Sequence, residues 1–411
     1  MKKILFMVSS MNIGGVEKSL LSLLSEIPSD KYDITLLLLE KKGGFLEQLP
    51  DWIKVEEANW FKDIKPIIMQ SPQQTIKDYI KSKKYFNILT FIGFYIIDKY
   101  FDNRYLYYKN IFKDIPFNEN EYDVAIAYQG PTDTIDYYIT HKVKAKKKIS
   151  WVHFDVSKHY INKKLYSKLY KKFNKIYAVS NEAKKQIDEI IPTVKYKTET
   201  FFNIISSNVI NNMKHEKVNF DESYEGINIA TVGRLSHEKG QDLAIEVMRK
   251  LKADGYLFKW YLVGDGLSRK TYEEMIDKYG LEKECVLVGA TPNPYPYIYK
   301  SDIYVQTSRH EGYCLTLAEA RCLSKPIVST DFIGAYEQIT NDKDGYITDC
   351  NIEDLYKKIK YLIDNKDVRE KFIFNLSKKR INTIEEISKL TSYIDGRDVY
   401  ESKDKYNSAS I

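Results

Sequence analysis

A chain of 411 residues is long for a single hydrophobic core, so its length favours two domains of ordinary size. Hydrophobic residues make up 43% of the chain and charged residues 29%, which excludes an intrinsically disordered protein. The four cysteines form no C-x-x-C pair and the six histidines show no metal-ligand spacing. These counts exclude a disulfide framework and a zinc pattern, and they fit a reducing cytoplasm.

The positive charge of the chain lies in its first half. Residues 1–200 carry 33 Lys and Arg against 24 Asp and Glu, whereas residues 201–411 carry 30 against 33. Two explanations stay open at this point. The first half either meets an anionic surface or ligand, such as a membrane, or has an unevenly charged soluble surface.

The first half alternates predicted strands and helices. The apolar run at residues 3–9 predicts a strand buried on both faces of a parallel sheet. A turn at Gly14 and Gly15 then leads into a helical pattern, and the early break in the apolar run argues against a signal peptide. Ser180 is expected to cap a later helix. Further strands are predicted at residues 32–40, 123–128, 148–153 and 175–179.

Residues 70–118 interrupt this alternation with an aromatic, basic sequence that predicts an inserted pair of helices. Its longest apolar stretch, residues 85–97, is too short to span a bilayer. A second amphipathic segment at residues 157–175 is rich in lysine and contains no acidic residue. Both segments are candidates for an anionic membrane face, and the alternative is an ordinary basic surface with a lid over the acceptor.

The second half repeats the alternation of strands and helices after a polar stretch near residues 204–226, which predicts a linker. The two halves therefore predict two doubly wound α/β domains. In such sheets ligands bind beyond the carboxyl ends of the strands. Residues that directly follow strands are therefore the best candidates for function.

Several chemically active residues occupy such positions. Arg234 and Lys239 follow a predicted strand and precede a helix, a pattern that suits a diphosphate but also suits solvated surface. Gly14 and Gly15 permit close approach of a phosphate or form a simple tight turn, and they do not make a G-x-G-x-x-G fingerprint. His153 ends a predicted strand, although a lone histidine is more often structural.

The stretch SRHEGYCLTLAEA places Glu311 and Glu319 eight positions apart. On one continuous helix they would lie roughly 80° apart, so they would not share a face. If Glu311 precedes the helix and Glu319 lies within it, both can reach one ligand. A carboxylate can accept hydrogen bonds from sugar or ribose hydroxyls, or stabilise positive charge on a sugar ring.

Taken in order, VGRLSHEKGQDLAIEV, YLVGDG, SDIYVQTSRHEGYCLTLAEA and KPIVSTDFIGAYEQI, with WVHFD and AVSNEAK before them, resemble the retaining nucleotide-sugar glycosyltransferases of family 4. The resemblance covers nearly all of the chain except residues 70–118, and it is closest to the branch that builds bacterial capsule and other surface polysaccharides. It implies the GT-B fold, an α/β architecture of two Rossmann-like doubly wound domains that face a central cleft. The expected divisions are an acceptor-side domain at 1–204, a linker at 205–226, a nucleotide-sugar domain at 227–394 and a polar tail at 395–411.

The resemblance also implies roles for individual residues. Arg234 and Lys239 would hold the donor diphosphate, Glu319 the ribose, Glu311 the donor sugar, and His153 would touch that sugar from the other domain. The donor would be a nucleoside-diphosphate sugar, UDP-linked, with no cofactor and no metal. Retention would follow from front-face attack after domain closure. Further donor contacts are expected from Gly14, Gly15, Gly264, Gly312, Tyr313, Cys314 and Leu315.

Two positions depart from the family pattern. Cys314 stands where glycine or proline is common, and Ser324 replaces a frequent glycine before Lys325 and Pro326. The implied acceptor is a glycan or polyprenyl-linked sugar, and the implied location is the cytoplasm, peripheral at the inner face of the plasma membrane. A GT-B-like nucleotide-sugar epimerase and a non-catalytic partner subunit are the alternatives. Nucleic-acid binding is disfavoured because the basic residues form no recognition motif.

Overall fold

The computed structural model describes residues 1–154, 156, 161–379 and 383–397. Its chain divides into two compact units. The first comprises Met1–Asn12, Leu24–Phe201 and the described residues from Lys389 onward, and the second comprises Ile13–Leu23 and Phe202–Ser388.

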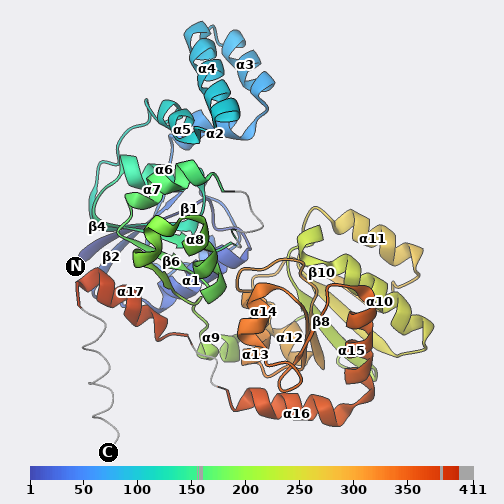
Figure 1. Ribbon diagram of the computed structural model, residues 1–411. Helices are drawn as coiled ribbons and strands as arrows, with labels where there is room; N and C mark the ends of the chain where they lie inside the picture. The colour runs from blue at the N-terminus through green and yellow to red at the C-terminus, as the bar shows by residue number, and fades with distance from the viewer. Residues whose placement is uncertain (155, 157–160, 380–382, 398–411) are drawn as a thin grey trace, which may run out of the picture. The chain divides into compact units, whose positions relative to one another are not determined.

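The first unit is built on a seven-stranded parallel sheet with the order β3-β2-β1-β4-β5-β6-β7 (Figure 1). The inner strand β1 is a continuous apolar run whose side chains from Ile4 to Val8 are fully buried, as expected for a strand covered on both faces. The strands are β1 (Lys2–Val8), β2 (Tyr32–Leu38), β3 (Lys54–Glu57), β4 (Glu121–Gly130), β5 (Lys144–Val152), β6 (Lys175–Ala178) and β7 (Thr198–Thr200).

Helices connect these strands, and the predicted N-terminal cap of α8 is present. Ser180 Oγ accepts a hydrogen bond of 3.1 Å from the backbone N–H of Ala183. The α-helices in this part of the chain are α1 (Gly15–Glu26), α2 (Phe61–Met69), α3 (Pro72–Lys81), α4 (Tyr85–Phe101), α5 (Arg104–Ile111), α6 (Asp133–Lys142), α7 (Lys163–Lys171) and α8 (Asn181–Ile190). The 3-10 helices are η1 (Leu46–Gln48) and η2 (Pro192–Lys197).

The predicted helical insertion is present, but its composition differs from the prediction. Residues 70–118 hold three helices, α3, α4 and α5, instead of a pair. The left-handed residue Asp102 ends α4 and separates it from α5, a turn that apolar periodicity does not reveal.

The second unit is built on a six-stranded parallel sheet with the order β10-β9-β8-β11-β12-β13. Its strands are β8 (Ile227–Val232), β9 (Phe258–Val263), β10 (Cys285–Gly289), β11 (Ile303–Gln306), β12 (Ile327–Thr330) and β13 (Tyr346–Thr348). Its helices are α9 (Ser207–Met213), η3 (His237–Lys239), α10 (Gln241–Ala253), α11 (Arg269–Lys278), α12 (Tyr295–Lys300), α13 (Leu315–Cys322), α14 (Ile333–Gln338), α15 (Ile352–Asp364) and α16 (Lys366–Ser377).

The two units depart from the predicted domain ranges in two places. The first turns of α1 group with the second unit, and most of α17 (Glu386–Asp395) groups with the first. Within the first unit, Lys147 Nζ donates to the carbonyl of Tyr393 at 2.6 Å and Lys2 Nζ to that of Ile394 at 2.8 Å. These contacts, far apart in sequence, tie α17 to the first sheet. No signal in a single sequence shows such a return of the chain. Most of the predicted tail lies outside the described residues.

The fold class is therefore α/β with two Rossmann-like parallel sheets, as predicted. The predicted linker contains the short helix α9, whose cap Ser206 accepts a hydrogen bond from Val209. Among the described residues, no helix combines the length and apolar character needed to cross a bilayer.

Candidate functional site

The carboxyl ends of the strands in the second sheet gather most of the predicted donor-site residues. Arg234 follows β8, Gly264 follows β9, and Glu311 follows β11 in the loop that leads into α13. Glu319 lies inside α13, so Glu311 precedes the helix and Glu319 belongs to it, as the spacing required. The second unit thus places these residues at one edge of its sheet.

An ion pair joins Lys239 to Glu311. The pair is mostly shielded, with 27% of the lysine side chain and 12% of the glutamate side chain exposed. Burial lowers the pKa of Lys239, but the adjacent Glu311 carboxylate outweighs this effect and holds the pKa above its usual value. The ammonium is therefore charged at neutral pH and available to an anionic ligand.

Three residues that were not predicted from the sequence, Arg309, Asp242 and Ser308, hold the loops around this pair. The Arg309 guanidinium forms a bidentate pair with Asp242 at 2.9 and 2.6 Å, and it also donates to the carbonyl of His237. This clamp joins the loop after β8 to the loop after β11. Ser308 Oγ donates to Glu311 at 2.9 Å and orients its carboxylate. For Ser308 and Arg309, the signal available in the sequence was their position beside Glu311 in the stretch SRHEG.

Glu319 is buried, with 2% of its surface exposed, and only one of its oxygens is occupied. Lys18 Nζ lies 2.6 Å from Oε1, and the Tyr295 hydroxyl donates to the same oxygen at 3.2 Å. The Lys18 ammonium also lies over the Tyr295 ring, 4.5 Å from its centroid. Oε2 has no hydrogen-bond partner among the described residues. A buried carboxylate oxygen without a partner is costly, so it is a natural acceptor for ligand hydroxyls.

The two glycines at the start of α1 belong to the same cluster. A side chain at Gly14 would approach the Glu17 carboxylate at 2.5 Å and the Arg234 guanidinium at 3.8 Å, and one at Gly15 would reach Leu315 at 4.0 Å. Burial raises the pKa of Glu17 despite the attraction of Arg234. The loop that contains Gly14 and Gly15 therefore lies close to Arg234 and Leu315, as predicted, and all four residues belong to the second unit.

The loop from Gly312 to α13 has a left-handed backbone at Cys314, with φ at 67°. Its preceding residue Tyr313 is buried, and the Gln338 amide donates to the carbonyls of Tyr313 and Cys314. Burial raises the pKa of the Cys314 thiol, which favours the protonated thiol over the reactive thiolate at neutral pH. Gln338 is a further residue that the sequence analysis missed.

Gly264 has a structural reason to be glycine. Its φ is 146°, and a side chain there would lie 2.0 Å from the carbonyl oxygen of Gly233. This close approach packs the end of β9 against the end of β8. Its predicted donor contact stays a prediction.

His153 lies in the first unit, directly after β5. Its ring packs against Tyr128, with centroids 4.7 Å apart, and its Nε2 has no partner among the described residues. Burial lowers the pKa of His153 to about 3, so the ring is neutral at physiological pH. Its predicted contact with the donor sugar stays a prediction.

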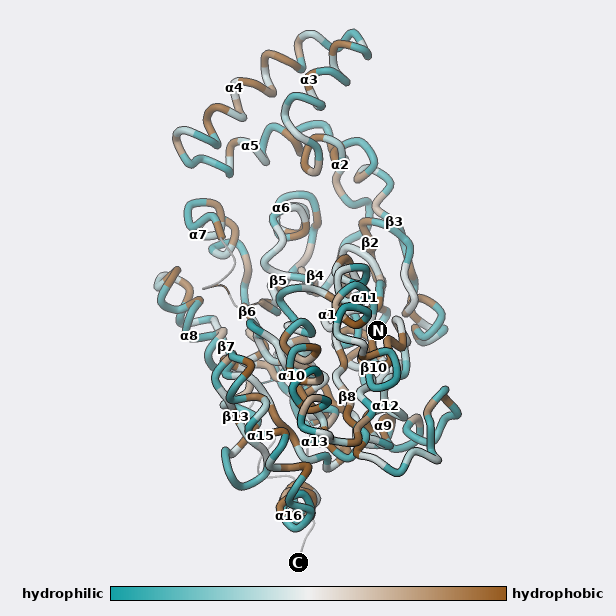
Figure 2. Tube along the Cα trace, turned by 90° about the vertical axis from the view of Figure 1, so that its right-hand side faces the viewer, coloured by the Kyte–Doolittle hydropathy of each residue, from teal (hydrophilic) through white to brown (hydrophobic). Residues whose placement is uncertain are grey.

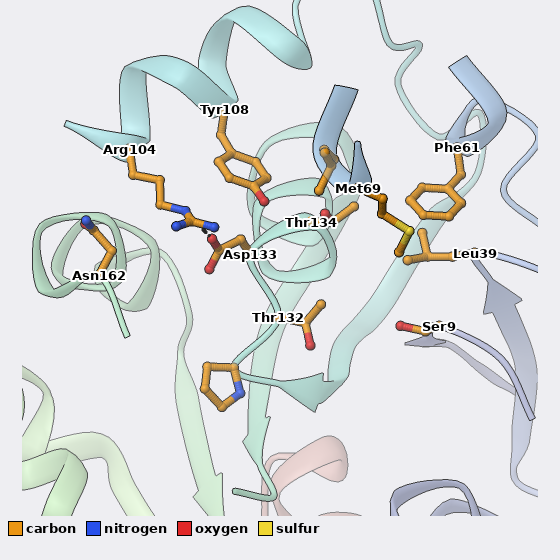
Figure 3. Close-up of a pocket in the computed structure, with 12 residues that line it drawn as sticks. Ser9, Leu39, Phe61, Met69, Arg104, Tyr108, Thr132, Asp133, Thr134 and Asn162 are labelled. Carbon is orange, nitrogen blue, oxygen red and sulfur yellow. Dashed lines mark ion pairs between the residues drawn. The ribbon is translucent and has the colours of Figure 1, made fainter. Parts of the chain in front are cut away.

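The first unit contains a pocket of about 330 Å³ at the carboxyl ends of β1, β2 and β4 (Figure 3). One side is polar, where Arg104 Nε lies 2.6 Å from Asp133, near Asn162. The opposite side is apolar and is formed by Leu39, Phe61 and Met69. None of these residues is predicted as a site residue from the sequence, because the insertion and three separate strand ends bring them together only in the fold. Its lining is Ser9, Leu39, Phe61, Ile68, Met69, Arg104, Tyr108, Pro131, Thr132, Asp133, Thr134 and Asn162.

The described residues contain no group of three or more His, Cys, Asp or Glu side chains arranged to hold a metal ion. The expected independence from metals stays a prediction.

Residues 214–379, which include the cluster around Lys239, Glu311 and Glu319, match the family model of glycosyl transferases group 1. This part of the chain is therefore similar to the group 1 glycosyl transferases. The matched range covers most of the second unit and every predicted donor residue except Gly14, Gly15 and His153.

Two curated relatives extend the likeness. An uncharacterized glycosyltransferase of Methanocaldococcus jannaschii is 30% identical over 199 residues, which are 45% of this chain and 48% of the relative. The N-acetylgalactosamine-N,N'-diacetylbacillosaminyl-diphospho-undecaprenol 4-alpha-N-acetylgalactosaminyltransferase of Campylobacter jejuni is 26% identical over 229 residues, 55% of this chain and 60% of the relative. The chain therefore spans about half to three fifths of these relatives' lengths.

The crystal structure of Anabaena HepE in complex with UDP-glucose superposes with a TM-score of 0.68 at 16% identity. The superposition covers 96% of this chain and 100% of HepE. The likeness confirms the predicted GT-B fold.

Proposed function

We propose that the chain is a group 1 glycosyl transferase, and that it is a retaining, metal-independent, hexosyl-type enzyme without a cofactor. It moves a sugar from a nucleoside-diphosphate donor to a glycan or lipid-linked sugar in bacterial capsule or other surface-polysaccharide synthesis. The observation that carries the proposal is the cluster around the loop between β11 and α13. There a charged Lys239 is paired with Glu311, and Glu319 has a free, buried oxygen. Anabaena HepE binds UDP-glucose, and this likeness favours a UDP-linked donor.

Each side chain has a task in this reaction. The Lys239 ammonium and the Arg234 guanidinium neutralise the diphosphate and stabilise the charge that grows on it as the glycosidic bond breaks. Glu319 Oε2 accepts from the ribose hydroxyls, and Glu311 accepts from the donor sugar. Backbone contacts come from Gly15, Gly264, Gly312, Tyr313, Cys314 and Leu315. The acceptor hydroxyl attacks from the face that the diphosphate leaves, which retains the anomeric configuration.

The pocket of the first unit is the proposed acceptor site. Its Asp133 carboxylate and threonine hydroxyls suit sugar hydroxyls, and its apolar side suits the hydrophobic face or substituent of an acceptor. The C. jejuni relative acts on a diphospho-undecaprenol acceptor, which favours a lipid-linked sugar here as well. The proposed location is the cytoplasm, with peripheral attachment at the inner face of the plasma membrane.

Replacing Met69 by tryptophan is expected to raise the acceptor KM by about tenfold while the donor KM stays unchanged. Met69 is 66% exposed at the rim of the pocket, so the larger ring fills the apolar side without disturbing a core. Steady-state kinetics with each substrate varied in turn measure both constants. Ile373→Trp, on the exposed surface of α16, is the matched control. Equal acceptor KM values for the two variants would place the acceptor elsewhere.

The decisive test of the function is a panel of nucleotide sugars offered with and without lipid-linked and soluble glycan acceptors. We expect UDP release only when donor and acceptor are both present, with a product whose mass rises by one sugar and whose NMR spectrum shows the donor's anomeric configuration. Conversion of the donor without an acceptor would identify an epimerase instead. Donor binding without turnover across the panel would identify a non-catalytic partner subunit.

A further inference from the structure

The insertion in the first unit carries an exposed apolar surface that the donor and acceptor sites do not use. Helices α3 and α4 form an arm, residues 72–101, that projects from the rest of the unit (Figure 1). Figure 2 shows apolar stretches along this arm. Phe86, Leu89 and Tyr100 on α4 are 70%, 73% and 72% exposed.

The inner face of α4 is already occupied. Phe91 is buried, and its ring packs against Tyr79 of α3 and Tyr107 of α5, with centroids 6.1 and 6.3 Å away. This contact anchors α4 to its two neighbours. The exposed apolar residues lie on the opposite face of the helix, so the fold itself does not bury them.

The exposed face is a continuous stripe. At 100° per residue its members fall within an arc of about 100°, centred opposite Phe91. The arc contains no charged residue. Its members are Tyr85, Phe86, Leu89, Gly93, Ile96 and Tyr100.

Lysines flank the stripe at both ends. Lys81, Lys83 and Lys84 are exposed before α4, and Lys99 is exposed near its end. Residues 77–101 contain five lysines and two aspartates. Of the aspartates, Asp78 accepts a hydrogen bond from Gln74, and Asp98 is partly buried with a raised pKa caused by that burial. The net charge beside the stripe is therefore positive.

We infer that the α4 stripe is a docking surface for an anionic lipid bilayer, with α4 lying in the plane of the interface. Aromatic and aliphatic side chains enter the boundary between headgroups and acyl chains, and the lysines meet anionic headgroups. A second copy of the chain fits this surface less well, because parallel or antiparallel pairing of two α4 helices brings lysines against lysines.

The second segment predicted for the membrane does not share this property. In α7, Leu165, Tyr166, Leu169 and Tyr170 are all buried in the core of the first unit. The apolar face expected at residues 157–175 is thus used for folding, and residues 157–160 lie outside the described residues. The inference concerns α4 alone. It names the part of the chain that would make the proposed peripheral attachment to the membrane. Only the identity of that membrane rests on the proposed function.

Flotation of the full chain with vesicles tests the inference without any donor or acceptor. We expect the protein to float with vesicles of phosphatidylcholine and phosphatidylglycerol at low salt, and to float poorly with phosphatidylcholine alone. The Phe86→Ser/Leu89→Ser variant is expected to lower the partition coefficient by at least about tenfold, and Lys81→Gln/Lys84→Gln by about tenfold at low salt.

Phe374→Ser/Leu267→Ser is the matched control, since it removes an exposed phenylalanine and an exposed leucine from the second unit. It is expected to float like the unaltered chain. Equal flotation of the α4 variant and this control would overturn the inference. So would a change from dimer to monomer for the α4 variant in vesicle-free solution, which would assign the stripe to a second copy. Because flotation needs no turnover, its failure is separate from failure of the proposed reaction.

Discussion

Substitution of Lys239 by alanine is expected to lower kcat/KM by about 10²–10³-fold, or about 3–4 kcal/mol of transition-state stabilisation. Lys239 supplies a fixed cation where negative charge grows on the leaving diphosphate. Its ammonium is partly shielded from water, which strengthens that interaction relative to an exposed lysine. Steady-state turnover with the donor and acceptor found in the panel gives both kcat and KM.

The alanine variant also leaves Glu311 without its cation, so its folding must be measured by thermal unfolding alongside its activity. Lys239→Arg keeps the charge and should recover part of the lost rate. Lys366→Ala, on an exposed lysine of α16, is the control for loss of a positive charge. Unchanged turnover in a folded Lys239→Ala protein would refute the proposed donor site.

Glu319 should behave differently from Lys239, because it is assigned to binding and not to the reacting bond. Glu319→Gln keeps the shape of the side chain but removes the charge that receives the ribose hydroxyls. The donor KM is expected to rise by about tenfold or more, with a smaller effect on kcat. The comparison separates diphosphate stabilisation from ribose recognition.

Most of the fold could be predicted from strand and helix patterns in the sequence, because the buried strands are continuous apolar runs and the turns contain glycine. The first strand, β1, was predicted within one residue at each end. The return of α17 to the first unit and the third helix of the insertion were not predictable in this way. Both depend on contacts between residues distant in sequence, such as Lys147 with Tyr393.

The donor residues were identified by their places after strands and by their resemblance to a family, whereas their partners were not. Lys18 lies one helical turn into α1, a position that is typical of a solvated lysine. In the structure it pairs with Glu319, which is 301 positions away in the sequence. Arg309 and Asp242 are similar cases. Such pairs follow only from the way in which the sheet brings its loops together.

The two positions that depart from the family pattern share an unusual backbone conformation. Cys314 and Ser324 both have positive φ, at 67° and 53°. Glycine adopts this backbone at little cost, whereas a residue with a side chain does so with strain. The frequent glycine at position 324 thus reflects backbone geometry, and Ser324 keeps that geometry here. Proline cannot adopt a positive φ, so this geometry does not explain the proline that is also common at position 314.

The largest expected effect on stability comes from Asp136, whose side chain is completely buried in α6 of the first unit. Burial raises the pKa of Asp136 to about 7, although the backbone N–H of Thr132, the Ser150 hydroxyl and the Tyr166 hydroxyl all donate to it. In the unfolded chain the pKa returns to about 3.9. Between these two values the folded state binds a proton that the unfolded state releases.

This difference in bound protons sets the direction in which the stability of the folded state changes with pH. Stability falls as pH rises from about 4 through about 7, and it is level above that, with a total change on the order of 2–4 kcal/mol. The side chain of the Asp136→Asn variant cannot ionise, so the free energy of unfolding of this variant is expected not to fall with pH in this way. Relative to the unaltered chain, the variant is therefore expected to become more stable as pH rises from 5 to 8.

Urea unfolding at several pH values, followed by tryptophan fluorescence, measures the slope. Trp52, Trp60 and Trp151 all lie in the first unit, so the signal reports mainly on that unit. Asp123→Asn is the matched control. The pKa of Asp123 is lowered by its hydrogen bond from Lys146, so its contribution appears above the unfolded pKa and is lost as pH falls. The difference between Asp123→Asn and the unaltered chain should therefore have the opposite sign. Parallel pH slopes for Asp136→Asn and the unaltered chain would mean that Asp136 stays ionised within the core.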